Sequence, residues 1–308
     1  MSTAAPVLDR RHAVDAAAVA IMIFLTFSWG LNGVAAKVSN TGFNPVFVSV
    51  ARSAIAAALV FLWCRARGIN LFDRDGTLPA GILAGFLFGA EFICIFFGFD
   101  YTSVARSSLM VNTMPFWVLV GAHFLLGERM SVTKLAGVAL AFCGVVVIFS
   151  DKLSAPGPDA WIGDLLTLFA GLLWAATTLA IKKSKLATTS AEKLLLYQLA
   201  VSAVMTAPLL LIGGPVFRAV SALNISALLF QAVFVVAFTY LVWFWLMRRY
   251  PAAGLASFAF LTPAFSVLLG GLLLDEPLTW RIGLALALIA GGLIVVNRPG
   301  RRQLPAAE

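Results

Sequence analysis

The sequence predicts an all-α integral membrane protein in which ten transmembrane helices form two inverted five-helix repeats around a central cavity. Of the 308 residues, 61% are hydrophobic and only 12% are charged, about half the charged fraction of an average soluble domain. Uninterrupted apolar stretches of roughly 18 to 23 residues recur, long enough to cross ~30 Å of hydrocarbon as helices. The alternating ten-residue segments of an outer-membrane barrel are absent.

The chain contains an internal repeat. Residues 105–130 read ARSSLMVNTMPFWVLVGAHFLLGERM, and residues 253–278 read AGLASFAFLTPAFSVLLGGLLLDEPL. In both, a proline inside an apolar run precedes a glutamate that ends the run, and we expect Glu128 and Glu276 to anchor the short turns into the following helices. Such a duplication is typical of membrane transporters. The matching positions are Pro115 and Pro263, Glu128 and Glu276, Gly144 and Gly292, and Trp29 and Trp174.

The polar stretch at 150–160 separates the two halves of the chain. We expect the first five-helix repeat over residues 14–150, the second over 161–297, and cytoplasmic tails at 1–13 and 298–308. No cleavable signal peptide is expected, because the first apolar run is too long and has no small-residue cleavage site. The expected spans are 14–36, 44–65, 78–98, 103–126, 132–150, 161–182, 193–213, 226–247, 252–274 and 279–297.

The distribution of Lys and Arg predicts the orientation. If the N-terminus is cytoplasmic, sixteen of the 22 Lys and Arg residues fall on the inner side, five fall on the outer side, and Arg52 lies within a span. This positive-inside bias predicts that both termini lie in the cytoplasm. The net charge of +8 then reflects this bias and attraction to anionic lipid headgroups rather than nucleic-acid binding.

Two ionisable side chains lie deep within the expected spans. Arg52 is about eight residues into the second span and Glu91 about eight residues before the end of the third, so both sit roughly 12 Å below the same surface. A charge at this depth costs a few kcal/mol unless it has a partner or a function. Three interpretations remain open: a structural ion pair, a substrate site in which Glu91 meets an ammonium and Arg52 a carboxylate, and an unpaired Glu91 that couples to protons.

Uncharged polar and aromatic side chains within the spans are further candidates. Any single polar side chain is more readily explained by packing between helices, but together the polar ones gather in spans one, four, six, eight and nine. The aromatic side chains are abundant in spans three and eight. Spans five and ten are almost purely apolar and are expected at the periphery or at a dimer surface. The expected substrate-binding residues are Trp29, Asn32, Arg52, Glu91, Asn112, Trp174, Thr178, Tyr240, Trp243 and Thr262.

Prolines and glycines predict how the spans bend and pack. Pro115 and Pro263 each remove a backbone donor inside a span, so a kink is expected at each, and these two positions are the expected gating hinges. Gly81, Gly85 and Gly89 form a small-residue ladder on the third span, which permits close approach of a neighbouring helix.

With these features in view, the chain resembles the EamA family of the drug/metabolite transporter superfamily. The features that carry the resemblance occur twice: a tryptophan in the first span of each half, a proline in the fourth, and a GERMS-like or DEPLT-like junction before the fifth. The resemblance covers about residues 15–297 and implies ten transmembrane helices, a central cavity and alternating access without ATP hydrolysis. The YddG-type amino-acid exporters of bacterial inner membranes share these features, as do general metabolite and drug exporters. The resemblance therefore implies a multi-pass protein of a bacterial-type inner (plasma) membrane.

The sequence and this resemblance together predict a secondary transporter of small amphipathic metabolites, with amino-acid export, including aromatic or apolar amino acids, as the favoured activity. The export direction is implied by the resemblance alone. Spans one to four are expected to rock against spans six to nine. The alternatives are a multidrug or other metabolite (nucleoside, sugar) exporter and a membrane-embedded enzyme acting on a lipid-linked substrate. We expect no catalytic residue, cofactor or metal, because the chain has no GxxxxGK[ST] loop and no cysteines at metal-ligand spacing. The expected partners are the small-molecule substrate and the lipid bilayer, and the protein is expected to be a monomer or homodimer.

Overall fold

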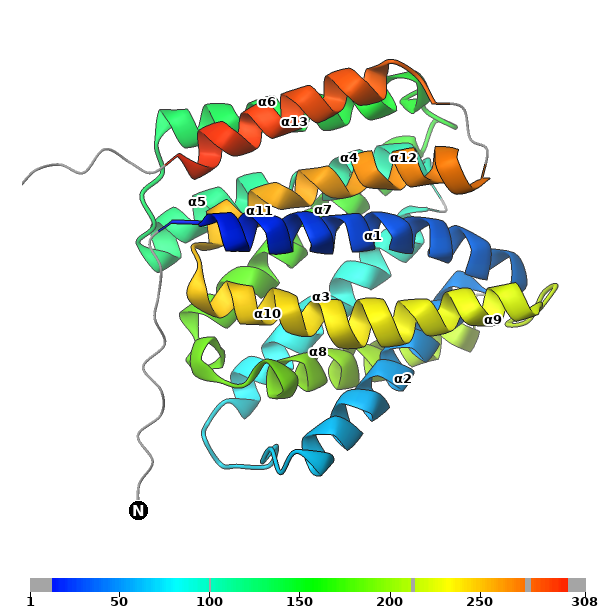
Figure 1. Ribbon diagram of the computed structural model, residues 1–308. Helices are drawn as coiled ribbons and strands as arrows, with labels where there is room; N and C mark the ends of the chain where they lie inside the picture. The colour runs from blue at the N-terminus through cyan, green and yellow to red at the C-terminus, as the bar shows by residue number, and fades with distance from the viewer. Residues whose placement is uncertain (1–12, 100, 212–213, 275–277, 299–308) are drawn as a thin grey trace, which may run out of the picture.

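In the computed structural model the described residues form helices joined by loops, with one isolated β-bridge between Phe43 and Phe217 (Figure 1). Among these residues, nine helical segments are long and apolar enough to cross a membrane, and Arg281–Asn297 is a shorter apolar helix. The ten segments confirm the predicted all-α membrane fold. Glu276 and nearly all of both predicted tails lie outside the described residues. The structure describes residues 13–99, 101–211, 214–274 and 278–298.

Polar residues cap many of the helices and fix where the apolar segments begin. Asp15 Oδ1 accepts a hydrogen bond from the Ala18 amide at 2.9 Å, for example. Three spans are interrupted within their length: the fourth is α4 and α5, the eighth contains a π-helical segment between α9 and α10, and the ninth has a 3₁₀ turn between α11 and α12. The fifth and seventh spans end in 3₁₀ segments, Ser150–Lys152 and Ala207–Leu211. The helices are α1 (Ala16–Gly42), α2 (Pro45–Ala66), α3 (Leu78–Gly98), α4 (Val104–Val111), α5 (Met114–Leu126), α6 (Val132–Phe149), α7 (Ala160–Lys183), α8 (Ala191–Thr206), α9 (Ala222–Leu229), the π segment (Phe230–Thr239), α10 (Tyr240–Arg249), α11 (Ala252–Ser257), α12 (Leu261–Leu274) and α13 (Arg281–Asn297).

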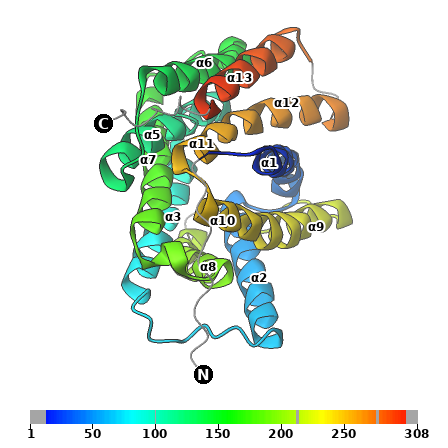
Figure 2. The ribbon, with the colours of Figure 1, turned by 60° about the vertical axis from the view of Figure 1, so that its left-hand side comes forward.

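The first helix of each repeat packs into the other repeat. α1 packs along α12 and against α9 and the π segment, whereas α7 packs against α3, α4 and α5. Figure 2 shows α1 between α12 and the α9–α10 span, with α7 on the other side beside α3 and α5. We therefore distinguish two lobes, lobe 1 (α1 and α9–α12) and lobe 2 (α3–α5 and α7). α2 and α8 pack on each other and connect the lobes.

The glycine ladder of the third span faces α8. A Cβ atom added at Gly85 would lie 2.6 Å from Val201 Cβ and 2.7 Å from the Tyr197 carbonyl oxygen. Gly81 and Gly89 face the same helix. The prediction of a close helix approach is confirmed, and the neighbour is α8.

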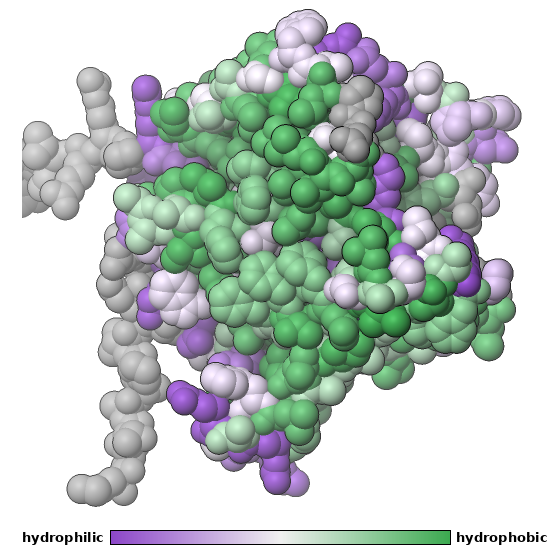
Figure 3. Space-filling view, turned by 45° about the vertical axis from the view of Figure 1, so that its right-hand side comes forward, coloured by the Kyte–Doolittle hydropathy of each residue, from purple (hydrophilic) through white to green (hydrophobic). Residues whose placement is uncertain are grey.

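The two almost purely apolar spans, α6 and α13, pack against each other at the edge of the molecule (Figure 1). A Cβ atom added at Gly144 of α6 would lie 2.7 Å from the Ala285 carbonyl oxygen of α13. The prediction that these spans are peripheral is confirmed. Apolar side chains cover much of the middle of the face seen in Figure 3, with polar residues toward its margins, as expected of a surface in contact with lipid.

Because each repeat contains five spans, the repeats cross the membrane in opposite directions. Helices α1 and α11 begin at one end of the bundle, and α5, α7 and α10 terminate there. We call this the basic end. There the Ala252 and Ala253 amides donate to Oε1 and Oε2 of Glu128, at 2.7 and 3.3 Å. The expectation that Glu128 anchors the turn into the next helix is wrong, because its carboxylate caps α11 of the other repeat.

Candidate functional site

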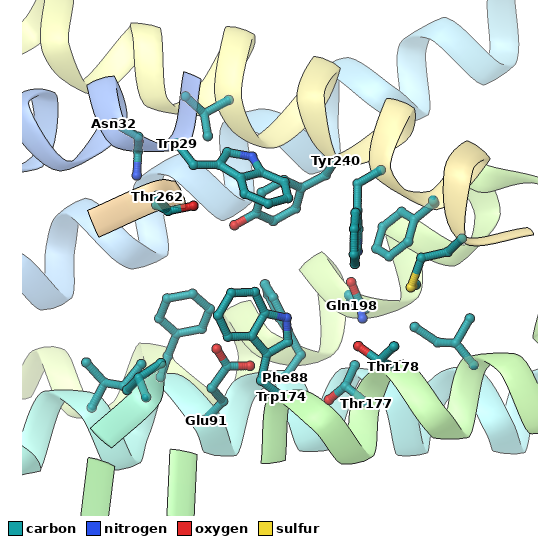
Figure 4. A pocket seen from close by; sticks show the side chains of 18 of the residues that line it. Trp29, Asn32, Phe88, Glu91, Trp174, Thr177, Thr178, Gln198, Tyr240 and Thr262 are labelled. Atoms are coloured by element: carbon teal, nitrogen blue, oxygen red, sulfur yellow. The ribbon is translucent and has the colours of Figure 1, made fainter. Parts of the chain in front are cut away.

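A cavity of about 260 Å³ lies between the two lobes. α1, α10 and α12 of lobe 1 face α3 and α7 of lobe 2 across it (Figure 4). The structure thereby brings together side chains that are far apart in the sequence. Nine of the ten substrate-binding residues expected from the sequence line this cavity, namely Trp29, Asn32, Arg52, Glu91, Trp174, Thr178, Tyr240, Trp243 and Thr262.

Aromatic rings form one wall of the cavity. Trp29 meets Tyr240 and Trp243 edge to face, with ring centroids 6.4 and 5.7 Å apart. The Trp29 indole N–H donates to Thr239 Oγ1 at 3.0 Å, and that hydroxyl donates to the Val235 carbonyl at 2.6 Å. Thr239 ends the π-helical segment, a rare conformation that is frequent at functional sites. The hydrogen bond fixes the Trp29 ring at the cavity wall.

A second group of aromatic rings faces Trp29 from lobe 2. Trp174 of α7 and Phe88 of α3 lie across the cavity from Trp29 (Figure 4). Phe88 meets Tyr240 edge to face, with centroids 6.4 Å apart. The rings of the two lobes therefore enclose a largely apolar space that suits a planar or aliphatic ligand group.

Four buried polar atoms of the cavity residues have no hydrogen-bond partner among the described residues. They are Asn32 Oδ1, Arg52 Nε, Glu91 Oε2 and Thr262 Oγ1, and they come from four different helices. An unsatisfied buried polar group costs about 1–3 kcal/mol, so native proteins contain few of them. The four atoms include acceptors and a guanidinium donor. Together they can bind a ligand that carries both a cationic and an anionic group.

Arg52 and Glu91 share the cavity, but in the described part of the chain they form no direct ion pair. The Arg52 guanidinium lies over the Phe92 ring, 4.9 Å from its centroid, as a cation–π contact. The Glu91 side chain is buried, and Arg52 is near enough for its charge to act on it. The two helices are therefore not locked by this pair, and both charged groups remain available to a ligand.

The break in the fourth span explains why one expected residue is not at the site. α4 and α5 are separated at Asn112 and Thr113, and Asn112 is not among the cavity-lining residues. The Asn112 side-chain amide donates to the Ser108 carbonyl at 2.7 Å, and this carbonyl also accepts the Asn112 backbone amide at 3.0 Å. The side chain is therefore bound to its own helix. Pro115 and Pro263 are buried in the first turns of α5 and α12, directly after the breaks in their spans.

Other cavity residues were not selected from the sequence. Gln198 had a usable signal, because a glutamine inside an apolar span is costly unless it is bound or functional. Thr177 and the phenylalanines are polar or aromatic residues within spans, and such residues are too common in this sequence to identify a site individually. The remaining side chains are aliphatic and carry no signal. The additional lining residues are Phe88, Phe92, Ile95, Val111, Thr177, Ile181, Gln198, Val235, Phe244 and Met247.

The fold and the cavity together define a class of protein. Apolar spans arranged as two inverted repeats around a polar and aromatic site near the midplane are the architecture of secondary transporters. The described residues contain no cluster of His, Cys, Asp or Glu that could hold a metal ion.

Comparison with known proteins gives the family. The model of the EamA-like transporter family matches residues 16–150 and, a second time, residues 161–298. The chain therefore belongs to the EamA-like transporter family, and it is a membrane transporter rather than an enzyme.

Two curated relatives and one solved structure illustrate the similarity. The uncharacterized transporter YoaV of Bacillus subtilis (strain 168) is 28% identical over 280 residues, covering 89% of this chain and 94% of that protein. A probable amino-acid metabolite efflux pump of Escherichia coli (strain K12) is 27% identical over 286 residues, covering 89% and 93%. A protein of known crystal structure has the same fold, with a TM-score of 0.78 over 91% of this chain and 96% of that one, at 21% identity.

Proposed function

We propose that this chain is a secondary transporter that exports amino acids, including aromatic or apolar ones, by alternating access without ATP hydrolysis. We place it in the plasma membrane, the inner membrane of a bacterial-type cell, with both termini in the cytoplasm. The observation that carries the proposal is the set of four unpartnered polar atoms in an aromatic-walled cavity between two lobes. Such a site fits a zwitterion with a hydrophobic side chain.

The four polar groups divide into two recognition elements. Glu91 Oε2 and Asn32 Oδ1 accept hydrogen bonds from the ligand α-ammonium, and Arg52 Nε and Thr262 Oγ1 donate to its α-carboxylate. Charge-assisted hydrogen bonds of this kind are roughly twice as strong as neutral ones. The ligand side chain then contacts the wall of Trp29 and the rings around it, where an aromatic or aliphatic group replaces water.

The size of the cavity favours a metabolite over a drug-sized molecule. Its volume of about 260 Å³ lies below the range of roughly 300–1,000 Å³ that is typical of drug-sized ligands. The E. coli relative is named as a probable amino-acid metabolite efflux pump, which supports the same substrate class and the export direction. A multidrug exporter remains the alternative, because lobe movement can enlarge the cavity.

Helix packing supports moving units that do not coincide with the two sequence repeats. Rocking spans one to four against spans six to nine separates α1 from α12 and α7 from α5, which are close contacts in the structure. We therefore propose that lobe 1 moves against lobe 2, with α2 and α8 as the links between them. The broken spans at Pro115 and Pro263 supply the bends.

Counterflow in proteoliposomes tests the proposal. The purified protein is reconstituted with a panel of labelled amino acids, and wild type is compared with Glu91→Gln and Arg52→Ala. We expect exchange of a subset that includes aromatic or apolar amino acids, and a loss of about tenfold or more in each variant, since each removes a hydrogen bond to a charged group. Arg65→Ala is the matched control, because it removes the same side chain from an exposed position at the end of the same helix.

Three outcomes contradict parts of the proposal. If no amino acid exchanges in the wild type while drugs or nucleosides do, the substrate class is wrong. If exchange persists in both folded variants, Arg52 and Glu91 do not bind substrate. If Arg65→Ala loses exchange as strongly as Arg52→Ala, the loss does not report on the cavity.

A further inference from the structure

A second recess, of about 730 Å³, opens at the basic end of the bundle. It lies where the α5–α6 turn, the C-terminus of α7 and the C-terminus of α10 meet, so three segments distant in sequence build it. It is separate from the central cavity, with which it shares only Met247 in its lining. Six cationic side chains line it: Arg129, Lys134, Lys182, Lys183, Arg248 and Arg249.

Backbone carbonyls accept hydrogen bonds from several of these cations. Lys183 donates to the Leu125 carbonyl at 2.7 Å and Lys134 to the Arg129 carbonyl at 3.0 Å. Arg248 donates to the Thr188 carbonyl at 3.3 Å, while its buried Nε has no acceptor among the described residues. A backbone carbonyl orients a cation but does not cancel its charge.

The carboxylates of Asp15 and Glu128 beside this recess already accept hydrogen bonds, and Asp15 does so from the Tyr250 hydroxyl of the lining. Glu128 is the acidic residue in the lining, and both of its oxygens are occupied by the α11 amides. Glu192 of α8 acts on Arg248 from outside the lining. The recess is therefore a concave, strongly cationic surface with a buried guanidinium N–H that lacks an acceptor.

The recess is continuous with apolar surface. Leu125 belongs to its lining and is exposed, and the neighbouring Phe124 is 74% exposed. Arg249 lies over the ring of Trp245, an exposed indole, at 4.2 Å. Tryptophans in this position are typical of the boundary between lipid headgroups and acyl chains. A ligand here meets cations at one end and hydrocarbon-like surface at the other.

We propose that this recess binds the phosphate headgroup of an anionic phospholipid, whose acyl chains lie against the exposed apolar residues beside it. Basic pockets between transmembrane helices bind such headgroups by charge and by hydrogen bonds from Arg and Lys. The adjoining apolar surface is what favours a lipid over a free phosphate. The site joins the ends of α5 and α7, which belong to lobe 2, to the end of α10, which belongs to lobe 1.

Native mass spectrometry of the detergent-purified full chain tests the proposal. Phosphatidylglycerol, phosphatidylcholine and inorganic phosphate are titrated separately into wild type, Arg129→Gln/Arg249→Gln and Arg65→Gln/Arg67→Gln. The last variant removes two charges from the same end of the bundle but outside the recess. We expect the wild type to retain phosphatidylglycerol in preference to phosphatidylcholine. The recess variant should bind it about thirtyfold more weakly, at roughly fivefold per lost cation, and the control should bind as wild type.

Several results overturn the proposal. If phosphatidylglycerol binding weakens equally in both double variants, the lipid is attracted by the overall positive charge of this end and not bound at a specific site. Equal retention of the two lipids shows no headgroup recognition, and tight binding of inorganic phosphate that excludes the lipid shows a soluble anion as ligand. Thermal unfolding verifies that each variant is folded. If the recess double variant is not folded, Arg129→Gln alone, at an exposed position, must weaken phosphatidylglycerol binding about fivefold for the proposal to stand.

Discussion

Lys193 is a buried charge that depends on one exposed partner. Its side chain is 5% exposed at the start of α8, and its Nζ donates to Asp75 Oδ2 at 2.8 Å and to the Asp73 carbonyl at 3.3 Å. The Thr77 hydroxyl and amide also donate to the Asp75 carboxylate, at 2.6 and 3.0 Å. The hydrogen bond from Lys193, followed by those from Thr77, lowers the pKa of Asp75 below its usual 3.8. This pair ties the loop before α3 to α8.

We predict that Asp75→Asn lowers the thermal unfolding temperature at neutral pH, because it leaves the Lys193 charge buried without its carboxylate. Since the folded-state pKa is depressed, the stabilisation is full above pH 3.8 and is lost as the pH falls from there through the folded-state pKa. The gap between wild type and variant should therefore be constant from pH 7 to pH 5 and close only in stronger acid. Asp73→Asn, whose carboxylate binds Asn70 instead, should show a smaller effect. Equal unfolding temperatures of wild type and Asp75→Asn at pH 7 contradict the prediction.

The cost of polar groups in lipid made the cavity residues predictable. Arg52, Glu91, Asn32 and Thr262 each stand out in an apolar span, and the structure places all four around one cavity. The same reasoning selected Asn112, which instead bonds to its own helix backbone, because a sequence does not reveal whether a nearby carbonyl satisfies a polar side chain. Aliphatic lining residues lie at the cavity only through the packing of distant helices, and nothing in their identity indicates it.

At the scale of elements, the contact between α3 and α8 depends on the absence of side chains. We predict that Gly85→Ala destabilises the protein by about 1–3 kcal/mol, because the added Cβ meets the Tyr197 carbonyl oxygen, a backbone atom that cannot turn aside. Thermal unfolding in detergent measures the effect. Gly291→Ala in α13 is the control, since its Cβ would have only Leu140 nearby, at 3.6 Å. An unchanged or raised unfolding temperature for Gly85→Ala shows that α3 and α8 adjust freely.

Hydrophobic length predicted every span, but it does not say which helices pack together. Gly30 of α1 lies so close to α12 that an added Cβ would be 2.6 Å from Phe265 Cβ. The glycine is visible in the sequence, whereas its partner depends on the shapes of both helices. The prolines predicted bends, and the structure places the breaks just before them. The apolar residues 230–239 give no hint of a π segment, because their pattern also fits an α-helix.

At the scale of the whole molecule, the two ends of the bundle are held differently. At the basic end α5 packs on α11, and Glu128 caps α11, whereas α4 and α12 make no comparable contact in the described residues. Within lobe 1, the Tyr250 hydroxyl donates to Asp15 at the same end and joins α10 to the start of α1. In an inverted repeat, closure at one end and its loss at the other are the two mirror-related states of alternating access. We infer that this conformation is closed at the basic end.

We predict that Glu128→Ala opens the basic end, because it removes the acceptors for the Ala252 and Ala253 amides. Loss of a helix cap costs about 0.5–2 kcal/mol, so the ratio of open to closed molecules should rise about 2- to 30-fold. The measurement uses a background in which Cys64, Cys94 and Cys143 are replaced, with one cysteine introduced at Ile181 in the cavity lining. A membrane-impermeant thiol reagent added at the basic end should then label this cysteine faster.

Glu192→Ala is the matched control for this prediction, since it removes a carboxylate from the same end without removing the α11 cap. Its labelling rate should equal that of the parent. If Glu128→Ala also labels at the parental rate while remaining folded, the cap does not hold the basic end closed, and closure must then depend on the packing of α5 on α11 alone. If both variants label faster, the cause is the loss of negative charge at this end. The prediction holds only if labelling is faster in Glu128→Ala and unchanged in Glu192→Ala. In that case the Glu128 carboxylate of one repeat holds α11 of the other repeat in the closed arrangement.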